Sequence, residues 1–409
     1  MAKRRLKKFK GKVVAVTGSV GKTSTKEAIF TVLNSQFKVK KSKKSMNTDI
    51  GLLLTILDIE SGFSSATKWS WFLLKGFFHS FFRDHSEVLL LEFGVDKPGD
   101  MDFLLSVVKP DIAVMTNIFP VHLDNGQFKD LQDIFDEKKK MVEKLKDNGV
   151  AILNIDNTYV EHLAKSRGKR KTVTYGKNDN ADFWASNIKS TVEGTTFTLH
   201  NGDHKFPVKV KVLGDYQVYV LMPAIICGHL FGMSVETAIA ALERYNLPPG
   251  RLNIIPGKEG ITILDSSYNS SPAALNEALK VLKDVGVDRR KVAVLGNMNE
   301  LGEESQVLHE MVGDMAAKCC DLLITVGSQA KFIAEKATPL LGEENVFSFK
   351  NVNEAIEFYK ERLKEDDLVL AKGSQNNVRL EKFVKEFMAH PEEAKELLVR
   401  QEKVWQAKL

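Results

Sequence analysis

The stretch Val13-Val14-Ala15-Val16-Thr17-Gly18-Ser19-Val20-Gly21-Lys22-Thr23-Ser24-Thr25 decides the fold. Its first four residues are apolar and include three β-branched valines, which predicts a buried parallel strand. Residues 26–33 continue with the spacing of a helix. The two glycines between these elements let the backbone approach an anion closely, and Lys22 adds a full positive charge. The stretch therefore predicts a phosphate-binding loop between a strand and a helix.

This loop is a shortened version of the general phosphate-loop pattern. That pattern, G-x-x-x-x-G-K-[ST], requires a glycine where this chain has Val16, so the motif here is G-x-x-G-K-T. An ordinary glycine turn before a surface helix is the alternative, but the β-branched strand directly before the turn favours nucleotide binding. We also expect the Thr23 hydroxyl to hold Mg²⁺. The residues expected around the nucleotide phosphates are Thr17, Gly18, Ser19, Val20, Gly21, Lys22, Thr23 and Ser24.

The composition is that of an ordinary globular protein. A chain of 409 residues is too long for one compact core and predicts two or three domains. Hydrophobic residues at 43% and charged residues at 27% lie near globular averages, which excludes a disordered chain and a membrane bundle. The three cysteines form neither a metal spacing nor a disulfide framework, and no apolar segment follows the basic N-terminus. We therefore expect a cytoplasmic protein.

Two segments raise the question of a partner. The first twelve residues hold much of the net charge of +5, which predicts a solvated, frayed arm over residues 1–11, with contact to an anionic membrane or nucleic acid as alternatives. Residues 60–86 are rich in Trp and Phe. Core packing or a domain contact is their main interpretation. Weak contact of residues 68–83 with a membrane surface is the other, because Lys68, Lys75 and Arg83 flank the rings.

Further strands bring polar side chains to the edge of the sheet that carries the loop. Two apolar runs predict parallel strands that lead to Glu92 and Asn117, and His122 follows the second. Ligands of open α/β sheets gather at the carboxyl ends of the strands. Because Mg²⁺ prefers oxygen ligands, Glu92 is a natural partner of Thr23, and His122 suits a second ion position. A carboxylate simply exposed at a strand end is the alternative.

The rest of the chain predicts a change of architecture. Between residues 172 and 212 short alternating strands are typical of an antiparallel patch with one wet face, and two helices follow. The segment Pro248-Pro249-Gly250-Arg251 is typical of a linker. Beyond it, strands that alternate with helices predict a second parallel sheet. These strands are expected at residues 261–264, 292–295, 322–326 and 368–370.

The predicted fold is therefore α/β, with a central phosphate-loop mononucleotide-binding domain, whose sheet is mostly parallel, and a C-terminal Rossmann-like α/β domain. The boundaries we expect are a basic arm at 1–11, the central domain at 12–250, the C-terminal domain at 251–390 and a charged, solvated tail at 391–409.

In the first of these domains the motifs resemble those of the Mur ligases, the ATP-dependent amide-forming enzymes of peptidoglycan precursor synthesis. The shortened loop is similar to theirs, and so is the pattern Thr116-Asn117-Ile118 followed by His122-Leu123-Asp124. Residues Asn47, Asp49, Ile50 and Gly51 match a segment that lies beside the substrate in the D-alanyl-D-alanine-adding type. The resemblance also implies that Lys138 is the lysine that the family carbamylates to bridge its metal ions. In the family's pattern Gly-Glu follows this lysine, where this chain has Lys139-Lys140.

The second half continues the resemblance. Arg251 falls on the family's Pro-Gly-Arg arginine, which reaches the terminal phosphate of ATP, and a planar guanidinium suits that oxygen cluster. The segment from Asp265 through Tyr268 and Asn269 resembles Asp-Asp-x-Tyr-Asn, and implies nucleotide contacts. The Gly-Asn-Met-Asn-Glu-Leu-Gly run that contains Asn297, and the Lys-Gly-Ser run that begins at Lys372, are similar to segments near the incoming amine.

The resemblance runs from about residue 12 to about residue 388 and is closest to the D-alanyl-D-alanine-adding type. It implies addition of that dipeptide to a UDP-N-acetylmuramoyl-tripeptide-like acceptor through an acyl phosphate, with ATP and Mg²⁺ as cofactors and ADP and phosphate as products. The partners expected are small molecules, with no nucleic acid, and the chain is expected to be a monomer. Because the loop starts at residue 17, we expect the family's N-terminal uridine-nucleotide domain to be missing. The catalytic residues implied are Lys22, His122, Lys138 and Arg251, and the metal positions are Thr23, Glu92, His122 and Lys138.

Two other functions stay open. One is a Mur-like ligase for a different, non-uridylated carboxylate, which the absent uridine domain favours and the C-terminal motifs oppose. The other is a non-catalytic ATP-binding subunit that partners another ligase. The joint presence of Lys22, Thr23, Glu92, His122 and Arg251 opposes that alternative, since a site without catalysis has no physical need to retain them.

Overall fold

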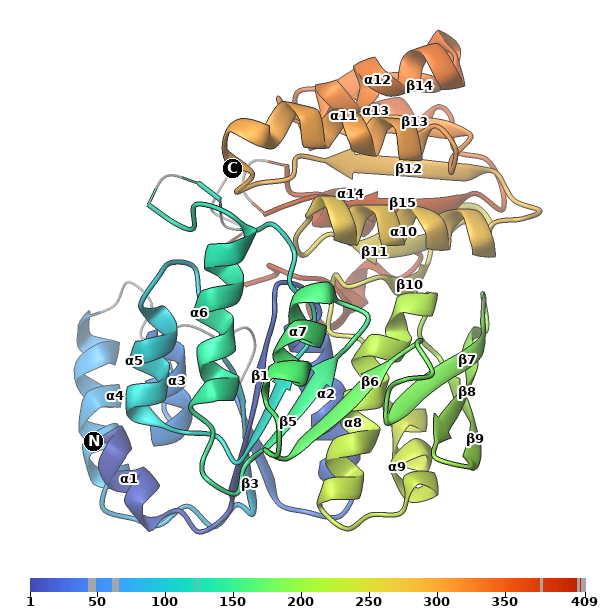
Figure 1. The fold of residues 1–409 in the computed structure, drawn as a ribbon. Helices are drawn as coiled ribbons and strands as arrows, with labels where there is room; N and C mark the ends of the chain where they lie inside the picture. The colour runs from blue at the N-terminus through green and yellow to red at the C-terminus, as the bar shows by residue number, and fades with distance from the viewer. Residues whose placement is uncertain are drawn as a thin grey trace. The chain divides into compact units, whose positions relative to one another are not determined.

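The computed structural model describes residues 1–42, 49–60, 66–121, 123–124, 126–375, 378–402 and 405. The chain divides into two compact units (Figure 1). The first unit contains residues 1–188, 196–210 and 217–245. The second contains the short segments 189–195 and 211–216 together with the chain from residue 246 onward.

The first unit is built on a nine-stranded sheet with the strand order β2-β3-β1-β4-β5-β6-β7-β8-β9. Every neighbouring pair from β2 to β7 is parallel, because helical crossovers connect most of these strands. The strands are β1 (Lys12–Thr17), β2 (Val39–Lys41), β3 (Val88–Glu92), β4 (Ile112–Met115), β5 (Val150–Asn154), β6 (Thr172–Gly176), β7 (Phe183–Thr191), β8 (Gly194–Asn201) and β9 (His204–Val210).

Helices cover both faces of this sheet. Side chains of α3, α5, α6 and α7 form one core cluster with the strands, and α2 and α8 pack against each other and against the strands. The helices are α1 (Ala2–Lys8), α2 (Lys22–Leu33), α3 (Asp49–Leu57), α4 (Ala66–His79), α5 (Asp100–Val107), α6 (Leu131–Glu143), α7 (Thr158–Ser166), α8 (Val218–Leu230) and α9 (Val235–Ala241), with 3₁₀ turns at Asp215–Gln217 and Leu242–Arg244.

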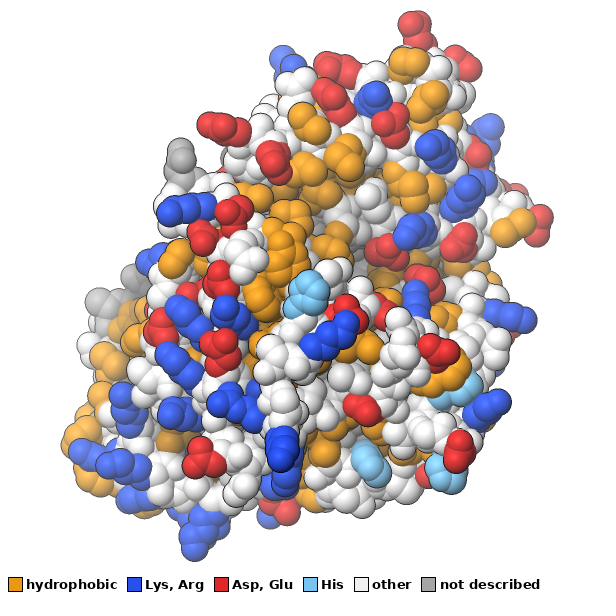
Figure 2. All heavy atoms as spheres, viewed as in Figure 1, with side chains coloured by type: hydrophobic (Ala, Val, Ile, Leu, Met, Phe, Trp, Pro, Cys, Tyr) orange, Lys and Arg blue, Asp and Glu red, His pale blue; other side chains and the backbone are white. Residues whose placement is uncertain are grey.

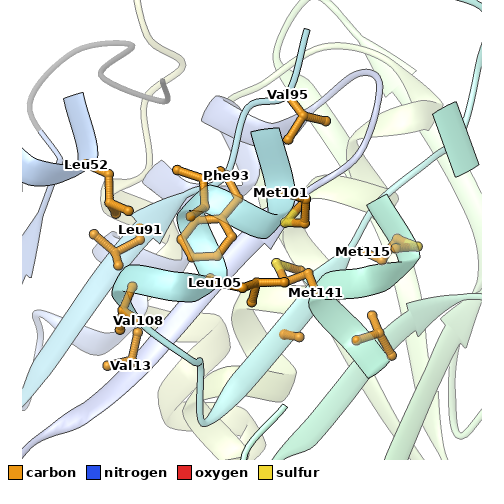
Figure 3. Close-up of a cluster of buried hydrophobic side chains, with 14 of the residues drawn as sticks. Val13, Leu52, Leu91, Phe93, Val95, Met101, Leu105, Val108, Met115 and Met141 are labelled. Carbon is orange, nitrogen blue, oxygen red and sulfur yellow. The ribbon is translucent and has the colours of Figure 1, made fainter. Parts of the chain in front are cut away.

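The alternation of β1 explains why its valine-rich run forms a central strand. Val13 and Ala15 face the cluster shown in Figure 3. In this cluster Leu91 of β3 and Phe93, which directly follows β3, pack with methionines of neighbouring elements. Val14 and Val16 are fully buried as well, although they do not belong to this cluster. A strand that is buried on both faces has a continuous run of apolar residues in its sequence. This run is the feature from which the strand was predicted.

The basic N-terminal segment is a helix, so the prediction of a frayed, solvated arm is wrong. In α1, Ala2 belongs to the core cluster of the first unit, and Leu6 and Phe9 pack against that cluster. Arg5 is buried, with its guanidinium 3.3 Å from the Asp84 carboxylate. The i, i+4, i+7 spacing of the three apolar residues gives the helix one side that packs, and the density of lysines obscured this spacing.

The second unit is built on a six-stranded sheet with the order β10-β11-β15-β12-β13-β14. β10 and β11 are antiparallel, and the other neighbouring pairs are parallel. The strands are β10 (Asn253–Pro256), β11 (Thr262–Ser266), β12 (Lys291–Gly296), β13 (Leu322–Val326), β14 (Val346–Phe349) and β15 (Leu368–Lys372).

Helices again pack on both faces of this sheet, around two separate clusters of buried side chains. One cluster joins the strands to α10, α11 and α12, and the other joins them to α13 and α14. This arrangement and the mostly parallel sheet of the first unit confirm the predicted α/β fold class. The helices are α10 (Pro272–Val285), α11 (Ser305–Ala316), α12 (Lys331–Leu341), α13 (Val352–Lys360), α14 (Glu381–Phe387) and α15 (Ala394–Leu397), with 3₁₀ turns at Lys258–Gly260, Gly302–Glu304, Glu343–Asn345 and Pro391–Glu393.

The C-terminal tail is also packed in its described part, contrary to the prediction of a solvated helix. Ala394 and Leu398 lie in a core cluster of the second unit. The Arg400 guanidinium is buried, and its Nη1 donates to the Ser267 carbonyl and to the Glu381 carboxylate, both at 3.1 Å. A buried arginine needs such partners, and they come from distant parts of the chain that the sequence does not connect to the tail.

Candidate active site

The phosphate loop lies between β1 and α2 in the backbone conformation that its glycines permit. Gly18 has φ +144° and Gly21 has φ +83°, a left-handed conformation directly before the helix. A Cβ atom at Gly18 would lie 2.0 Å from the Thr116 hydroxyl oxygen. Glycine is therefore required at position 18 both by conformation and by space.

Hydrogen bonds hold this loop to the segment that follows β4. The Ser19 amide donates to the Asn117 carbonyl at 2.6 Å, and the Ser19 hydroxyl donates to the Phe119 carbonyl at 2.8 Å. The Thr116 hydroxyl donates to the Val20 carbonyl at 2.8 Å. These hydrogen bonds fix the loop to the segment that follows β4. Thr116 was identified from its motif, but its contact with the loop was not predicted. Phe119 was missed, because it acts through its backbone.

Lys22 folds back over the loop. Its ammonium donates to the carbonyls of Gly18 at 2.8 Å and Ser19 at 3.0 Å, which keeps the positive charge at the loop. At the end of β1, the Thr17 hydroxyl donates to the Phe93 carbonyl at 2.9 Å and fastens β1 to the end of β3.

The structure brings Thr23 and Glu92 together, as the sequence predicted. The Thr23 hydroxyl donates to the Glu92 carboxylate at 3.0 Å, and both side chains are buried. In the parallel pairing of β1 with β3, Val16 is the register partner of Glu92, which places the carboxylate beside the start of the loop. Threonine hydroxyls and carboxylates are oxygen ligands of the kind that Mg²⁺ takes.

Lys26 is a residue of this site that sequence reasoning missed. It is fully buried one turn into α2, with its ammonium 3.5 Å from Glu92 and 3.5 Å from Glu27. It also donates to the hydroxyl and the carbonyl of Ser42, at 3.2 and 3.3 Å. A lysine at the start of a helix is usually solvated, so nothing in the sequence indicated that this one balances a buried carboxylate.

Lys138 lies on α6 and is fully buried. Among the described residues its Nζ atom has no hydrogen-bond partner. Burial, and next the positive charge of Lys22, hold the pKa of Lys138 well below its usual range, against the opposite effect of Asp96 and Glu137. The cationic form of this amine is therefore strongly disfavoured.

The first unit contains a pocket of about 370 Å³ that is lined by residues of α3, of the segment from β3 to α5, and of positions 126–127. Burial, and then the charge of Asp100, raise the pKa of Asp49, one of the residues expected near the substrate. Two other expected site residues, Asn47 and His122, lie outside the described part of the chain. The residues that line the pocket are Asp49, Ile50, Gly94, Asp96, Lys97, Asp100, Gly126 and Gln127.

Asn117 lies at the carboxyl end of β4, as expected, but its side chain makes a hydrogen bond to a residue of the neighbouring strand β5. Its Oδ1 accepts a hydrogen bond from the Asn154 amide at 2.8 Å. Asn154 is the last residue of β5, and Asn157, which follows that strand, donates to the Ile118 carbonyl at 3.0 Å. These asparagines stabilise the segment to which the phosphate loop is fixed.

In the second unit, two buried ionisable groups lie at the ends of neighbouring strands. Burial raises the pKa of Asp265 to about 6, and its Oδ1 accepts from the Ser267 amide at 3.0 Å. Burial, and next the charge of Arg251, lower the pKa of Lys372 to about 7. The Lys372 ammonium donates to the Ser266 hydroxyl at 3.2 Å and to the Asn269 carbonyl at 3.0 Å.

Arg251 lies beside the same segment of the second unit. Its guanidinium carbon is 4.4 Å from the centre of the Tyr268 ring. The Tyr268 amide donates to the Gly250 carbonyl at 3.1 Å, which fixes the two segments to each other. In the described chain, the buried hydroxyls of Ser270 and Ser271 have no hydrogen-bond partner, so this corner holds polar atoms that a ligand could satisfy.

Asn297 and His309 hold backbone together. The Asn297 Oδ1 accepts from the amides of Gln329 and Ala330 at 3.0 and 2.9 Å, just before α12. His309 is fully buried, and its Nε2 accepts from the Met298 amide at 3.0 Å. Both contacts stabilise loops at the carboxyl ends of the strands, and a substrate contact of Asn297 stays a prediction.

The first unit has a phosphate loop in a mostly parallel sheet, with a carboxylate beside the loop's threonine, and a second α/β unit follows it in the sequence. These features define a nucleotide-binding enzyme of two domains. The chain belongs to the Mur ligase family, whose members are ATP-dependent amide ligases. The family model described as the Mur ligase middle domain matches residues 16–228, and the model described as the Mur ligase, glutamate ligase domain, matches residues 250–375. This confirms the predicted family and enzyme class.

Named relatives agree with this assignment. The chain is 29% identical over 392 residues to a UDP-N-acetylmuramoyl-tripeptide–D-alanyl-D-alanine ligase of Bacillus subtilis, covering 96% of this chain and 79% of the relative. It is 30% identical over 325 residues to the Escherichia coli ligase of the same name, covering 79% of this chain and 66% of the relative.

Among solved structures, the chain is similar to the MurF ligase of Thermotoga maritima in complex with ADP, with a TM-score of 0.79 and 27% identity, covering 96% of this chain and 82% of that one. Folylpolyglutamate synthase of Mycobacterium tuberculosis has a TM-score of 0.66 at 15% identity, covering 91% of this chain and 89% of that one. The second likeness concerns the fold alone.

Proposed function

We propose that this chain forms an amide bond between D-alanyl-D-alanine and a UDP-N-acetylmuramoyl-tripeptide-like carboxylate at the expense of ATP. The observation that carries the proposal is the phosphate loop whose Thr23 hydroxyl contacts the buried Glu92 carboxylate at 3.0 Å. These substrates are the ones that appear in the names of the Bacillus subtilis and Escherichia coli relatives. Such small molecules, a monomeric chain without nucleic acid, and a cytoplasmic location are part of the proposal.

The triphosphate of ATP is proposed to bind the amides of residues 18–23. Lys22 is proposed to contact the phosphates, because its ammonium lies at the loop, where it donates to the Gly18 and Ser19 carbonyls. Thr23 and Glu92 are proposed as Mg²⁺ ligands, and His122 as a ligand outside the described residues. When bound, Mg²⁺ would offset the negative charge on the phosphates. Arg251 is proposed to bind the terminal phosphate through its planar guanidinium.

Lys138 is proposed to carry a carbamate. A buried amine whose cationic form is disfavoured is uncharged and nucleophilic. Its nitrogen would add to the carbon of CO₂ and lose one proton, which gives an anionic carbamate in place of the uncharged amine. That anion would suit a site that already holds Lys22. Among the described residues Nζ has no hydrogen-bond partner, so no hydrogen bond within the described chain has to be broken for this addition.

The reaction proposed has two steps. A carboxylate oxygen of the acceptor attacks the γ-phosphorus of ATP, the bond from that phosphorus to the β–γ bridging oxygen breaks, and an acyl phosphate and ADP result. The amine of the dipeptide then attacks the acyl carbon, the bond from that carbon to the phosphate oxygen breaks, and the nitrogen loses a proton. The protein's part is to hold the groups in line and to offset phosphoryl charge.

In the second unit, Asp265, Tyr268 and Asn269 are proposed to contact the nucleotide, and Asn269 and Lys372 to line the amine site. The buried, unpartnered hydroxyls of Ser270 and Ser271 support a ligand near this segment. Asp49 is proposed to contact the acceptor, because it lines the pocket of the first unit. The domain boundaries at 12–250 and 251–390 remain part of this proposal.

The test is phosphate release from ATP with a panel of carboxylate acceptors and amines. Turnover that requires both the UDP-linked tripeptide and D-alanyl-D-alanine supports the proposal. Turnover with a non-uridylated acid instead would favour the alternative substrate class. An absence of turnover with every pair, together with tight ATP binding, would favour a non-catalytic nucleotide-binding subunit.

A further inference from the structure

Helix α4 and the turn that follows it present an unusually apolar surface. Side chains of this kind rarely gather on the outside of a soluble protein, and a continuous group of them marks a surface for binding. In Figure 2, orange hydrophobic and blue basic side chains occur together at the lower left of the view, where Figure 1 places α4 and α1. We call these residues the aromatic face: Trp71 (65% exposed), Leu73 (48%), Leu74 (50%), Phe77 (44%), Phe78 (55%), Phe81 (45%) and Phe82 (66%).

The opposite side of α4 already packs on the protein. Trp69 and Phe72 pack against the core cluster of the first unit, and a Cβ atom at Gly76 would lie 3.1 Å from the Ile59 side chain. The His79 ring is 2.7 Å from the Leu57 carbonyl. Packing of α4 therefore does not explain the aromatic face, which lies on the other side of the helix.

Basic side chains border the aromatic face. Helix α1 contacts its C-terminal end, since the Lys8 ammonium donates to the Phe81 carbonyl at 2.6 Å and the Arg4 guanidinium carbon is 4.6 Å from the centre of the Phe81 ring. The packing of Ala2, Leu6 and Phe9 directs the lysines of α1 outward. The exposed basic residues of the two segments are Lys3, Arg4, Lys7, Lys8, Lys10, Lys68, Lys75 and Arg83.

The two segments that form this surface carry charge of one sign. No aspartate or glutamate occurs in residues 1–12 or 66–83. Residue Asp84 follows, but its carboxylate is paired with Arg5 and Lys40. Exposed Trp and Phe side chains beside lysines and arginines, in segments that contain no acidic residue, are the composition of helices that lie in the interface of an anionic bilayer.

We propose that the aromatic face, with the bordering lysines of α1, binds the surface of an anionic lipid bilayer. No helix within the described ranges is long and apolar enough to cross a membrane, so the contact is peripheral. The aromatic side chains enter the headgroup and upper acyl region, and the lysines contact lipid phosphates. A protein partner is disfavoured, because it would need a broad apolar surface and an acidic border at the same time. This inference does not depend on the ligase activity.

The experiment is flotation of the full chain with vesicles of phosphatidylcholine alone and with vesicles that also contain phosphatidylglycerol. Binding is expected to the anionic vesicles and to fall as salt is raised. Lys3→Gln, Lys7→Gln and Lys10→Gln together are expected to weaken binding about a hundredfold, because each basic residue near an anionic surface contributes independently. Trp71→Ser with Phe82→Ser is expected to weaken it at least about tenfold, through loss of buried apolar area.

The matched control is Val287→Ser with Leu340→Ser, which removes two exposed apolar side chains from the second unit, 76% and 59% exposed. It should leave vesicle binding unchanged. Quenching of Trp fluorescence by brominated lipids measures how deeply the aromatic face enters the bilayer. Trp71→Phe should remove most of this quenching. Melting curves of each variant report whether it is folded.

An absence of binding to anionic vesicles at low salt would overturn the proposal, and so would equal binding by the folded aromatic-face variant and the wild type. A concentration-dependent dimer that the Trp71 and Phe82 substitutions abolish, without vesicle binding, would assign this face to a second copy of the chain instead.

Discussion

The Thr23 hydroxyl and the Glu92 carboxylate are joined by a hydrogen bond of 3.0 Å, and Glu92 also faces the buried ammonium of Lys26 at 3.5 Å. One carboxylate thus serves the phosphate loop and balances a buried cation. Its removal should therefore affect activity and stability together, which a carboxylate at an exposed strand end would not do.

Glu92→Gln tests this dual role. The amide keeps the shape of the side chain but loses the charge, so ligation should fall about a hundredfold or more. The free energy of unfolding should fall by about 2 kcal/mol, because Lys26 loses a buried counter-charge. Product formation and urea unfolding measure the two effects. Glu27→Gln is the control, since Glu27 is also 3.5 Å from Lys26 but partly exposed, and it should change unfolding by less than about 1 kcal/mol. Equal effects of the two substitutions would contradict the assignment.

Gly18→Ala tests the conformation of the loop. An alanine Cβ at this position would meet the Thr116 hydroxyl at 2.0 Å, in addition to the strain of φ +144°. We expect a loss of at least about 2 kcal/mol of stability and loss of ATP binding, measured by calorimetry. Gly202→Ala is the control, because Gly202 has φ +56° with nothing within 4 Å of the added methyl, so only about 1 kcal/mol should be lost. ATP binding by folded Gly18→Ala with unchanged affinity would show that the loop conformation is not needed.

The pairing of Thr23 with Glu92 was predictable from the sequence for a definite reason. Apolar runs identified β1 and β3 as strands buried on both faces, and parallel strands deliver their carboxyl ends to one edge. The residues that follow such runs are therefore expected to be neighbours from the sequence alone. Asp265 and Lys372 were instead indicated by the family resemblance, and the structure places them at the ends of the neighbouring strands β11 and β15, where their register partners are Ala371 and Ser266.

The residues that sequence reasoning missed depend on contacts over long separations. Nothing in the sequence indicated that Lys26 is buried, yet its ammonium faces the Glu92 carboxylate, 66 positions later in the chain. Arg400 bonds to the Ser267 carbonyl across a separation of 133 residues. Neither periodicity nor a local motif records such contacts, because a charged side chain in a polar stretch looks the same whether it is solvated or buried.

Lys138→Met should separate stability from activity. An apolar side chain of similar length replaces a buried amine, so the free energy of unfolding should rise by about 1 to 3 kcal/mol, whereas ligation should be lost. The pKa of Lys138 is lowered in the folded state, so the unfolded state binds more protons, and stability should rise with pH toward 10.5. This contribution should be absent from the variant. Lys139→Met, at a partly exposed neighbour, is the control for both readouts. Full activity of the Lys138 variant would refute the carbamate.

Lys372 should make the free energy of unfolding depend on pH within a defined range. Its pKa is lowered from 10.5 to about 7 in the folded state, so between these values only the unfolded state holds the proton. Stability should therefore rise with pH across this window, by at most about 1.4 kcal/mol per pH unit. Urea unfolding of the wild type and Lys372→Met at several pH values measures the difference. Parallel curves for the two proteins would show that Lys372 is not the titrating group.

Arg400→Ala tests whether the tail is part of the second unit. The guanidinium donates to the Ser267 and Tyr268 carbonyls and to the Glu381 carboxylate, which is almost fully buried. Its loss should lower the free energy of unfolding by about 3 kcal/mol, although Arg379 remains as a partner of Glu381. Because the two carbonyls flank the Tyr268 amide, hydrogen exchange at residues 267–269 should also accelerate. Arg400→Lys keeps the charge but cannot span three acceptors with a planar group. Its free energy of unfolding should therefore lie between those of the wild type and Arg400→Ala. A tail that is merely solvated would give a variant with wild-type unfolding and unchanged exchange.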